Sequence, residues 1–341
     1  SDQSRALVPR VGVIGLGYWG RNLVRNVAAL GALEAMCDPS REARAALSAL
    51  YPGVDVTDDA GAIFANPRIE AVMIATPAVT HGALAASALA AGKHVFVEKP
   101  LGLTLDSAAR IVRVCRTAGV TLGVGHERRF EPPQVDLREM VQAGLLGTLM
   151  QVEANFSHDR FVALDTDNWR LSAKEAPAGG MTATGIHLLD LGIALLGEPV
   201  TAYASSATLG SDIANGDSLS VCVRFDSGAT LTINVMLATP FISRFACFGS
   251  QGWVEIRDKA HVEAPQGWTF THATAGREPQ TRTYPVAKPV LANLNAFADA
   301  AAGRASYPIS HEGMLRTIAA LEAVFKSAAT GRVQEIRKVA T

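Results

Sequence analysis

The sequence predicts an α/β protein with two domains: a doubly wound parallel sheet, then an α+β domain with a large, open and mostly antiparallel sheet. The chain has 341 residues, which is more than one core usually supports, and its hydrophobic content of 48% is ample for burial. Residues 10–125 alternate short apolar runs with alanine-rich helical stretches, a pattern typical of parallel sheets covered on both faces. After residue 133, apolar residues recur at every second position, as they do in antiparallel hairpins.

Six candidate strands define the first domain, which we assign to residues 1–127. The strands are expected at 11–14, 33–37, 54–57, 71–75, 94–98 and 121–125. Helices are expected between them at 21–30, 41–50, 81–91 and 105–118, each ending near a glycine or a proline. This alternation is typical of the doubly wound Rossmann fold.

The remaining residues, 128–341, form the second domain in this prediction. A helix is expected at 134–143, followed by a hairpin that joins 219–225 to 229–236 and by a second hairpin across 249–252. Two helices between residues 291 and 330 close the chain, and we leave open whether they pack back on the first domain. Some outward positions of the sheet are apolar, which either a partner subunit or a scatter of exposed residues would explain.

Residues 11–20 predict a dinucleotide-binding loop. The first strand ends at Gly15, Gly17 lets the backbone approach a pyrophosphate, and Gly20 lets the next helix pack tightly on the strand. The start of that helix offers unpaired N–H groups and the positive end of its dipole to the phosphates. The other cofactor-binding candidates in this loop are Tyr18 and Trp19.

The acid that closes the second strand favours NAD as the cofactor. A carboxylate at Asp38 would bind the ribose 2′-hydroxyl and repel the 2′-phosphate of NADP. Arg41, three residues further on, would weaken that preference. Strand, glycines, helix, strand and acid follow one another in the expected order, which argues against a merely structural glycine loop.

Polar residues also follow the fourth and sixth strands, and ligands bind beyond the carboxyl ends of the strands in this architecture. Thr76 and Pro77 come directly after the fourth strand, where proline fixes the turn and the threonine could face a cofactor. His81 opens the next helix, either as a cofactor contact or as a helix-start residue. His126 ends the sixth strand and is expected to border the nicotinamide.

Glu98 and Lys99 follow the fifth strand and give the clearest catalytic signal. A partly desolvated lysine beside a cationic nicotinamide would have a lowered pKa. It could then hydrogen-bond a substrate hydroxyl and stabilise the alkoxide that forms as hydride leaves carbon. We expect Glu98 to hold either the lysine or the nicotinamide side of the cofactor.

His187 is the second catalytic candidate. It lies on a helix that follows the glycine loop at Gly179 and Gly180. Asp190, three residues on, could orient the imidazole ring and support its basicity. The alternative is a satisfied buried pair, but the place after the glycine loop favours a general base and acid.

Further side chains are candidates for substrate binding. Arg170 offers a planar fork suited to a carboxylate or to vicinal hydroxyls, and Trp169 could form an apolar wall for a ring. A surface ion pair and a core tryptophan are the alternative for these two. The full set of substrate-binding candidates is Lys99, Arg129, His158, Trp169, Arg170, Thr184 and His187.

In these motifs the chain resembles the glucose-fructose oxidoreductase, inositol dehydrogenase and MocA-type (Gfo/Idh/MocA) oxidoreductases over nearly its whole length. The resemblance rests on residues 15–20, Asp38-Pro39, 75–77 with His81, Glu98-Lys99-Pro100, Arg129-Phe130, Trp169-Arg170, Gly179-Gly180 and 185–190. It implies NAD(P) in the first domain, a sugar or cyclic polyol against the sheet of the second, and a homodimer or homotetramer formed through that sheet. It also implies that Lys99 is the lysine of the family's Glu-Lys-Pro motif and that His187 is its catalytic histidine.

The chain departs from the family pattern at Ala183. Many members carry an aspartate at this position, four residues before the histidine and on the same helix face. Three outcomes stay open: His187 suffices alone, a threonine or substrate carboxylate substitutes, or catalysis is lost. The leading hypothesis is hydride transfer between NAD and a secondary hydroxyl of a sugar, sugar acid or cyclic polyol. The alternatives are a dinucleotide-binding sensor or scaffold, and an NAD-assisted hydrolase or lyase without net redox change.

Composition limits the remaining classes of function. The formal net charge is −1, so the chain offers no basic field to nucleic acid or to an anionic membrane, and a small molecule is the expected ligand. Four widely spaced cysteines indicate neither a zinc site nor a disulfide framework, and we expect all four to be core thiols. No metal site is expected. No stretch approaches the length of a membrane span, and we expect a cytoplasmic protein.

Overall fold

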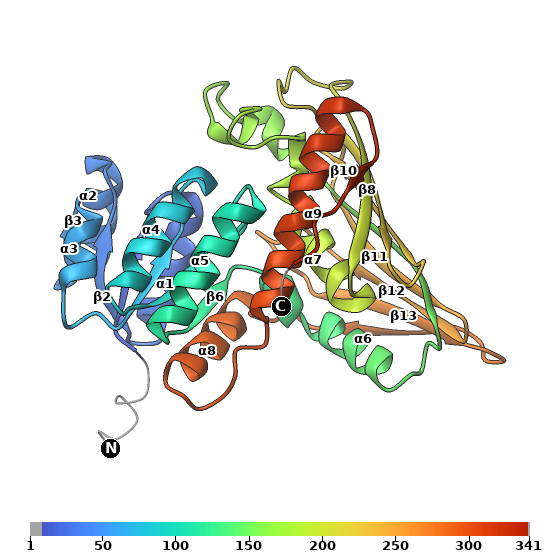
Figure 1. Ribbon diagram of the computed structural model, residues 1–341, viewed down its shortest axis with the longest axis horizontal. Helices are drawn as coiled ribbons and strands as arrows, with labels where there is room; N and C mark the ends of the chain where they lie inside the picture. The colour runs from blue at the N-terminus through green and yellow to red at the C-terminus, as the bar shows by residue number, and fades with distance from the viewer. Residues whose placement is uncertain (1–8, 340–341) are drawn as a thin grey trace. The chain divides into compact units, whose positions relative to one another are not determined.

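The computed structural model describes residues 9–339, which divide into two compact units. Unit 1 combines residues 9–126 with Val290–Met314, and unit 2 combines Glu127–Pro289 with the residues from Leu315 onward. Each unit is built around one large sheet (Figure 1). The helix near the C-terminus, α9 (His311–Thr330), begins in unit 1 and continues in unit 2.

Unit 1 is a doubly wound Rossmann fold, which confirms the predicted fold class. Its six strands are all parallel and lie in the order β3-β2-β1-β4-β5-β6. The strands are β1 (Val11–Ile14), β2 (Leu33–Cys37), β3 (Asp55–Thr57), β4 (Ala71–Ile74), β5 (His94–Val97) and β6 (Leu122–Val124). The helices that cover both faces of this sheet in Figure 1 are α1 (Tyr18–Ala29), α2 (Arg41–Leu50), α3 (Ala60–Ala65), α4 (Ala78–Ala90) and α5 (Leu105–Ala118).

Two helices of unit 1 begin three residues earlier than predicted. Gly17 is the N-cap of α1, and the Arg21 N–H already donates to the Gly17 carbonyl, so the first turn includes residues 18–20. Pro77 is likewise the N-cap of α4, since proline needs no N–H partner there. Both connections from strand to helix are therefore short, and each helix begins close to the end of the preceding strand.

Helix α8 (Pro289–Ala301) completes the core of unit 1 although it follows all of the unit 2 strands up to β14 in sequence. The Phe297 ring packs edge-on against Phe96 of β5 at a centroid distance of 5.6 Å, and both side chains are buried. The Asn293 amide donates to the Val124 carbonyl at 2.9 Å. Apolar packing and one satisfied buried hydrogen bond therefore hold α8 against β5 and β6.

Unit 2 contains a nine-stranded, mostly antiparallel sheet within the part of the chain that the structure describes. The strand order is β14-β13-β12-β11-β7-β10-β9-β8-β15, and β7 and β10 pair in parallel at its centre. The strands are β7 (Leu149–Ser157), β8 (Pro199–Ala207), β9 (Ser218–Phe225), β10 (Thr230–Met236), β11 (Ile242–Gly249), β12 (Gly252–Asp258), β13 (Trp268–Thr274), β14 (Gln280–Tyr284) and β15 (Gln334–Glu335). Both predicted hairpins are present, as β9–β10 and β11–β12.

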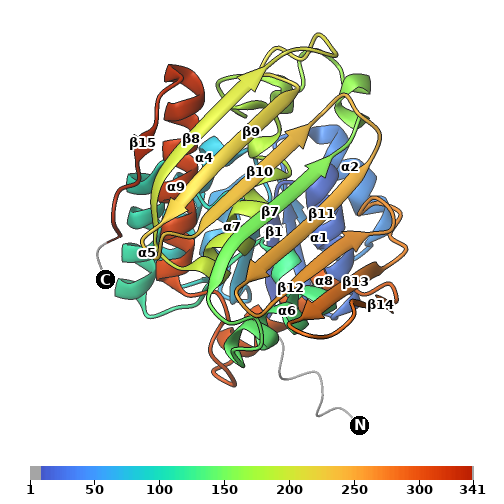
Figure 2. The ribbon, with the colours of Figure 1, turned by 90° about the vertical axis from the view of Figure 1, so that its right-hand side faces the viewer.

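The helices of unit 2 lie on one face of this sheet. Figure 2 shows the other face toward the viewer, with the helices behind the strands. They are α6 (Pro132–Gln142), α7 (Gly185–Leu196) and most of α9, with short 3₁₀ turns η2 (Glu127–Phe130), η3 (Arg160–Ala163), η4 (Trp169–Leu171) and η5 (Gly179–Met181). Alternate residues of the strands point toward the helices and are buried, as Leu231, Ile233 and Val235 of β10 illustrate.

The prediction that all four cysteines are core thiols is wrong for Cys222. This residue lies at an outward position of β9 and is exposed, whereas Cys37, Cys115 and Cys247 are buried. Burial raises the pKa of Cys37 and Cys115 to about 11 and that of Cys247 to about 12. The three buried thiols are therefore protonated and unreactive at neutral pH.

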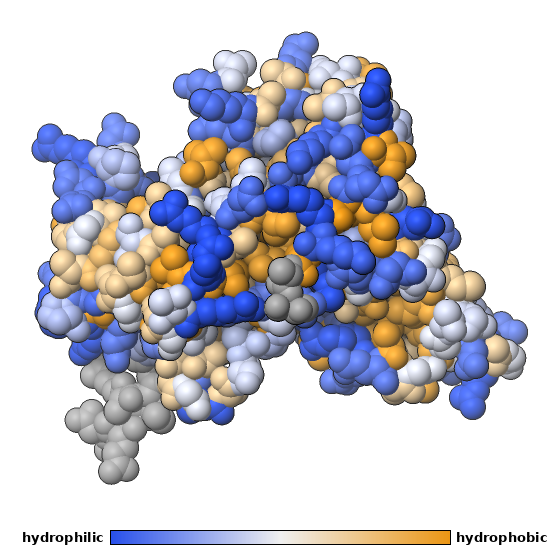
Figure 3. All heavy atoms as spheres, viewed as in Figure 1, coloured by the Kyte–Doolittle hydropathy of each residue, from blue (hydrophilic) through white to orange (hydrophobic). Residues whose placement is uncertain are grey.

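Hydrophilic and hydrophobic side chains are interspersed on the face of the molecule that Figure 3 shows. No helix among residues 9–339 combines the length and the apolar character needed to cross a bilayer.

The packing of α8 gives a stability prediction. We expect Phe297→Ala to lower the free energy of unfolding by about 3–5 kcal/mol, because it leaves a cavity beside Phe96. Urea unfolding of the full chain measures this change. Leu50→Ala is the control: Leu50 lies at the end of α2, is 69% exposed, and should change stability by no more than about 0.5 kcal/mol. Similar losses in the two variants would contradict the packing role of α8.

Candidate functional site

The glycine loop of unit 1 is shaped by close backbone contacts. Gly15 has φ +93°, and a Cβ there would lie 2.5 Å from the Ala75 carbonyl oxygen. A Cβ on Gly20 would lie 1.8 Å from the Gly15 carbonyl oxygen, so α1 can approach β1 only with glycine at this position. Gly17 differs, because a Cβ there would meet nothing within 4 Å. This open space lies at the N-terminus of α1, where backbone N–H groups can bind a phosphate.

Asp38 is held beside that loop by two backbone N–H groups. Leu16 donates to Oδ2 at 2.7 Å and Ser40 donates to Oδ1 at 2.8 Å. Both oxygens keep further acceptor capacity, so the carboxylate can also bind a ribose hydroxyl. Arg41 is the exposed first residue of α2, whereas Arg44 donates to the carbonyl oxygens of Asp38 and Pro39.

Tyr18 and Trp19 begin α1 and lie in different environments. Tyr18 is 59% exposed. The Trp19 ring is partly buried and packs against the apolar core of unit 1. A cofactor contact stays a prediction for both, and core packing by itself accounts for part of the role of Trp19.

His81 lies between two loops at the carboxyl edge of the sheet. Its Nδ1 is 2.7 Å from the Pro100 carbonyl oxygen, and its Nε2 is 2.8 Å from the Thr76 carbonyl oxygen. The residue is 1% exposed, and burial lowers the pKa of His81 although both carbonyls favour the charged ring. The structure thus gives His81 a role in joining the loop after β4 to the loop after β5. Contact with a cofactor stays a prediction.

Glu98 and Lys99 lie where β5 ends, next to the end of β6. The Glu98 carboxylate is buried against Gly125, where a Cβ would lie 2.3 Å from Oε2, and the Lys99 N–H donates to the same oxygen at 3.2 Å. His126 follows Gly125 and is 2% exposed. Because β5 and β6 are neighbouring parallel strands, their ends bring Glu98, Lys99 and His126 to one edge of the sheet.

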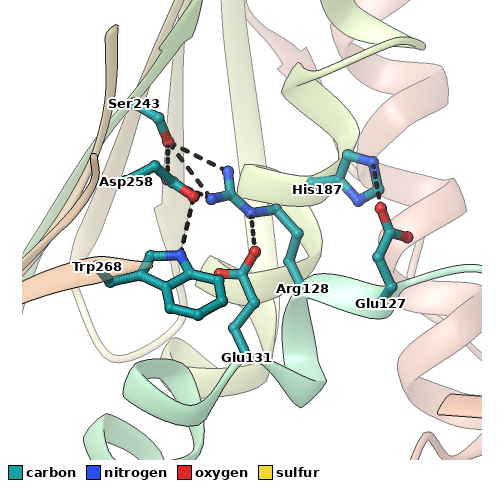
Figure 4. A network of polar contacts seen from close by, with 7 residues as sticks. All are labelled: Glu127, Arg128, Glu131, His187, Ser243, Asp258 and Trp268. Carbon is teal, nitrogen blue, oxygen red and sulfur yellow. Dashed lines mark hydrogen bonds and ion pairs between the residues drawn. The ribbon is translucent and has the colours of Figure 1, made fainter. Parts of the chain in front are cut away.

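In unit 2, η2 lies against α7, which carries His187. Glu127 of η2 approaches the His187 ring, with its Oε1 3.7 Å from Nε2 (Figure 4). The Asp190 carboxylate, which we expected to orient His187, accepts two hydrogen bonds from Arg129, at 2.6 and 2.7 Å. Thr317 of α9 donates to the same carboxylate at 3.3 Å. Arg129, a predicted substrate ligand, thus forms a bidentate ion pair that ties η2 to α7.

Arg128, between Glu127 and Arg129, enters a separate buried network (Figure 4). Its guanidinium donates to Glu131 at 2.9 Å and to Asp258 of β12 at 2.5 Å, and all three side chains are at most 7% exposed. Ser243 and Trp268 donate to the same Asp258 carboxylate. Burial opposes the charge of Arg128, yet the two carboxylates raise its pKa above the ordinary value.

The charge of this network depends on whether one of its two carboxyl groups, Glu131 or Asp258, is protonated. Burial raises the pKa of Glu131 to about 8, although Arg128 acts to lower it. One buried guanidinium faces two buried carboxylates, so the group is neutral only when one carboxyl is protonated. The pKa of Glu131 identifies it as the group that keeps the proton around neutral pH.

The other predicted substrate residues of unit 2 are spread over three segments. His158 directly follows β7, and its buried ring packs edge-on against Phe161 and His261. Burial lowers the pKa of His158, so its ring is neutral at pH 7. In η4, the Arg170 guanidinium stacks over the Trp169 ring at 4.6 Å. Substrate binding by these residues stays a prediction.

Thr184 and Ala183 lie just ahead of the His187 helix. The Thr184 hydroxyl is buried and lies within hydrogen-bonding distance of the Phe156 and Gly180 carbonyls, which gives it a structural role. Thr184 is also the N-cap of α7. Ala183 therefore precedes the helix, and the expectation that it shares a helix face with His187 is wrong.

Sequence reasoning missed Glu127, Arg128 and Glu131. Their signal was the charged run from Glu127 to Arg129, directly after the sixth strand, followed by Glu131 and two prolines. A charge run is usually a solvated surface, so the pattern alone did not indicate that these side chains turn inward. Only the packing of η2 against the sheet and α7 shows it.

The chain matches two protein-family models. Residues 9–126 match the oxidoreductase family with an NAD-binding Rossmann fold, and residues 135–255 match the GFO/IDH/MocA C-terminal domain.

Similar proteins have been named in several organisms. The chain is 31% identical over 275 residues to 1,5-anhydro-D-fructose reductase of Ensifer adhaerens, which covers 80% of this chain and 81% of that protein. It is 28% identical over 276 residues to a D-xylose 1-dehydrogenase (NADP(+)) of Haloferax volcanii, covering 81% and 83% of the two chains. A levoglucosan dehydrogenase in complex with NADH has the same fold, with a TM-score of 0.83 at 20% identity over 97% of this chain and 100% of that one.

The raised pKa of Glu131 makes stability depend on pH. The folded protein binds this proton more tightly than the unfolded chain, so its contribution to stability falls as pH rises from about 4.5 to about 8. Glu131→Gln keeps a neutral side chain and removes that contribution. We therefore expect the melting temperature of the variant, relative to wild type, to rise with pH across this window, as measured by thermal unfolding. Glu139→Gln, at an exposed position of α6, is the control and should show a constant difference. Parallel curves for wild type and Glu131→Gln would contradict the assignment.

Proposed function

The chain belongs to the GFO/IDH/MocA family of NAD(P)-dependent oxidoreductases, and on that premise we propose that it transfers hydride between a secondary hydroxyl and NAD. The proposed substrates are sugars, sugar acids and cyclic polyols. Relatives named as acting on 1,5-anhydro-D-fructose and D-xylose support this substrate class. The observation that carries the proposal is the position of Lys99 at the end of β5, on the same sheet edge as the dinucleotide loop.

The residues of unit 1 fit a bound dinucleotide. The open space beside Gly17, at the start of α1, suits the pyrophosphate, and any side chain there would occupy it. The Asp38 carboxylate, held by Leu16 and Ser40, supports NAD over NADP, because a 2′-phosphate beside it would be repelled. Arg41 could offset part of that repulsion, and one named relative uses NADP(+). We propose NAD as the preferred cofactor.

Bound NAD would supply the hydride acceptor, and the chain's own residues would handle the hydroxyl. We propose that Lys99 donates a hydrogen bond to the substrate oxygen and stabilises the negative charge that develops on it. His187 takes the hydroxyl proton in oxidation and returns it in reduction. Glu98, buried behind the Lys99 backbone, would keep that segment in place.

The outward face of the unit 2 sheet supports a homo-oligomer. No helix covers this face within the described chain (Figure 2). It carries Tyr203 of β8, which is 43% exposed, and Ile242 of β11, which is 38% exposed. We propose that a second copy of the chain covers it in a homodimer or homotetramer. Free cysteines at all four positions also agree with our proposal of a cytoplasmic location.

A substrate panel tests the reaction. The protein is incubated with NAD, and separately with NADP, and with polyols, sugars and sugar acids, while absorbance of the reduced cofactor is followed. We expect NADH to form with at least one member of the panel and NADP to be used less well. No reduced cofactor with any member would favour the sensor alternative, and conversion of substrate without net NADH would favour the hydrolase or lyase alternative.

Lys99→Met tests the catalytic role. We expect turnover to fall by at least about 100-fold, because the alkoxide loses its hydrogen-bond donor. Binding of NAD, measured by calorimetry, should change little. Lys288→Met, at an exposed position, is the matched control and should keep full activity. Turnover of Lys99→Met equal to that of wild type would rule out the assignment.

The mass of the protein in solution tests the oligomer. We expect sedimentation equilibrium to give two or four copies of the 35.9 kDa chain. Tyr203→Arg should weaken the assembly. At a symmetric interface the substitution buries one positive charge from each copy of the chain, and the two charges repel each other. A monomeric wild-type chain would contradict the proposal.

A further inference from the structure

We propose that Glu127 is the carboxylate that positions His187 and stabilises its protonated ring, in place of a carboxylate at position 183. The inference rests on the proposed function, in which His187 takes the hydroxyl proton. It concerns a positioning residue that would act through His187.

The geometry of the pair carries the proposal. Glu127 Oε1 lies 3.7 Å from His187 Nε2, and the two side chains are 16% and 6% exposed. Figure 4 shows the two side chains pointing toward each other, one from η2 and one from α7. A carboxylate this close to a largely buried ring stabilises the imidazolium more than it would in water. Ala183, by contrast, has no carboxylate and precedes the helix.

The segment that carries Glu127 is anchored on two sides. Arg128 pairs with Glu131 and with Asp258 of β12, and Arg129 pairs with Asp190, one turn beyond His187 on α7. The Arg129–Asp190 pair therefore fixes η2 to the same helix that presents His187. Glu127 lies between these ion pairs and the end of β6, so it has little freedom to move away from the His187 ring.

The other charged groups of η2 and α7 have opposite charges of their own close by. Within unit 2, Arg129 balances the Asp190 carboxylate, and Arg128 balances the Asp258 carboxylate and also donates to Glu131. The Glu127 carboxylate faces Nε2 of the His187 ring. It would raise the proton affinity of the ring and hold its orientation.

The proton released in the proposed reaction explains why a carboxylate beside His187 would matter. In oxidation, bound NAD would accept the hydride of the carbinol C–H bond, and the O–H proton would pass to His187. The ring gains a positive charge as the carbonyl forms. Glu127 neutralises that charge, as a carboxylate behind a catalytic histidine does.

Titration of His187 by NMR, in the full chain without substrate, tests the pairing directly. The chain has eight histidines, so the His187 signal is assigned by its loss in His187→Asn. We expect Glu127→Gln to lower the midpoint of this titration by about one pH unit. Glu127→Asp keeps the charge and should fall between Glu127→Gln and wild type. Glu139→Gln is the matched control and should leave the midpoint unchanged. An unchanged midpoint in Glu127→Gln would overturn the proposal.

The pH profile of kcat/KM gives the second readout. In the oxidation direction, activity rises as His187 loses its proton, so Glu127→Gln should move this limb to lower pH and reduce kcat about tenfold or more. Thermal unfolding confirms that the variant is folded. An unshifted limb in a folded variant would overturn the role of Glu127. If wild type oxidises no substrate, the proposed function fails, and the NMR titration still decides whether Glu127 controls His187.

Discussion

Two adjacent arginines fix the segment that follows the Rossmann sheet. Arg128 turns toward β11 and β12 and meets Asp258 and Glu131, while Arg129 turns toward α7 and meets Asp190. A buried guanidinium is costly unless its charge and its donors are satisfied, so each arginine holds its partners close to it. The position of α7 against η2, and with it the surroundings of His187, depends on these two ion pairs.

In unit 1, the parallel sheet imposes an equivalent constraint. All six strands end at one edge, so loops that are far apart in sequence gather there. The glycine loop, Asp38, His81 and Lys99 each follow a different strand or open the helix after it. His81 then joins two of these loops through their carbonyl oxygens, which couples the position of Lys99 to that of Thr76. The buried His81 ring thus supports both the segment that carries Lys99 and the loop at Thr76.

Much of unit 1 was predictable because its signals are local. Gly15 and Gly20 must be glycine for steric reasons that involve neighbouring backbone, and Asp38 closes an apolar strand. The early starts of α1 and α4 were missed. The sequence does not show that α1 already includes Gly20, or that α4 begins directly after Pro77. Cys222 was assigned to the core because cysteine is usually buried, whereas the strict alternation of β9 places it outward.

The sequence by itself determined the fold class, the dinucleotide loop and the candidate roles of Lys99 and His187. These features depend on periodicity and on spacing within short segments, which can be read directly from the sequence. The tertiary structure alone decided which charges meet. It assigned Asp190 to Arg129, brought Glu127 to His187, and buried Glu131, which raises its pKa to about 8. Partners such as Arg128 and Asp258 lie far apart in the sequence, and only packing of the elements brings them into contact.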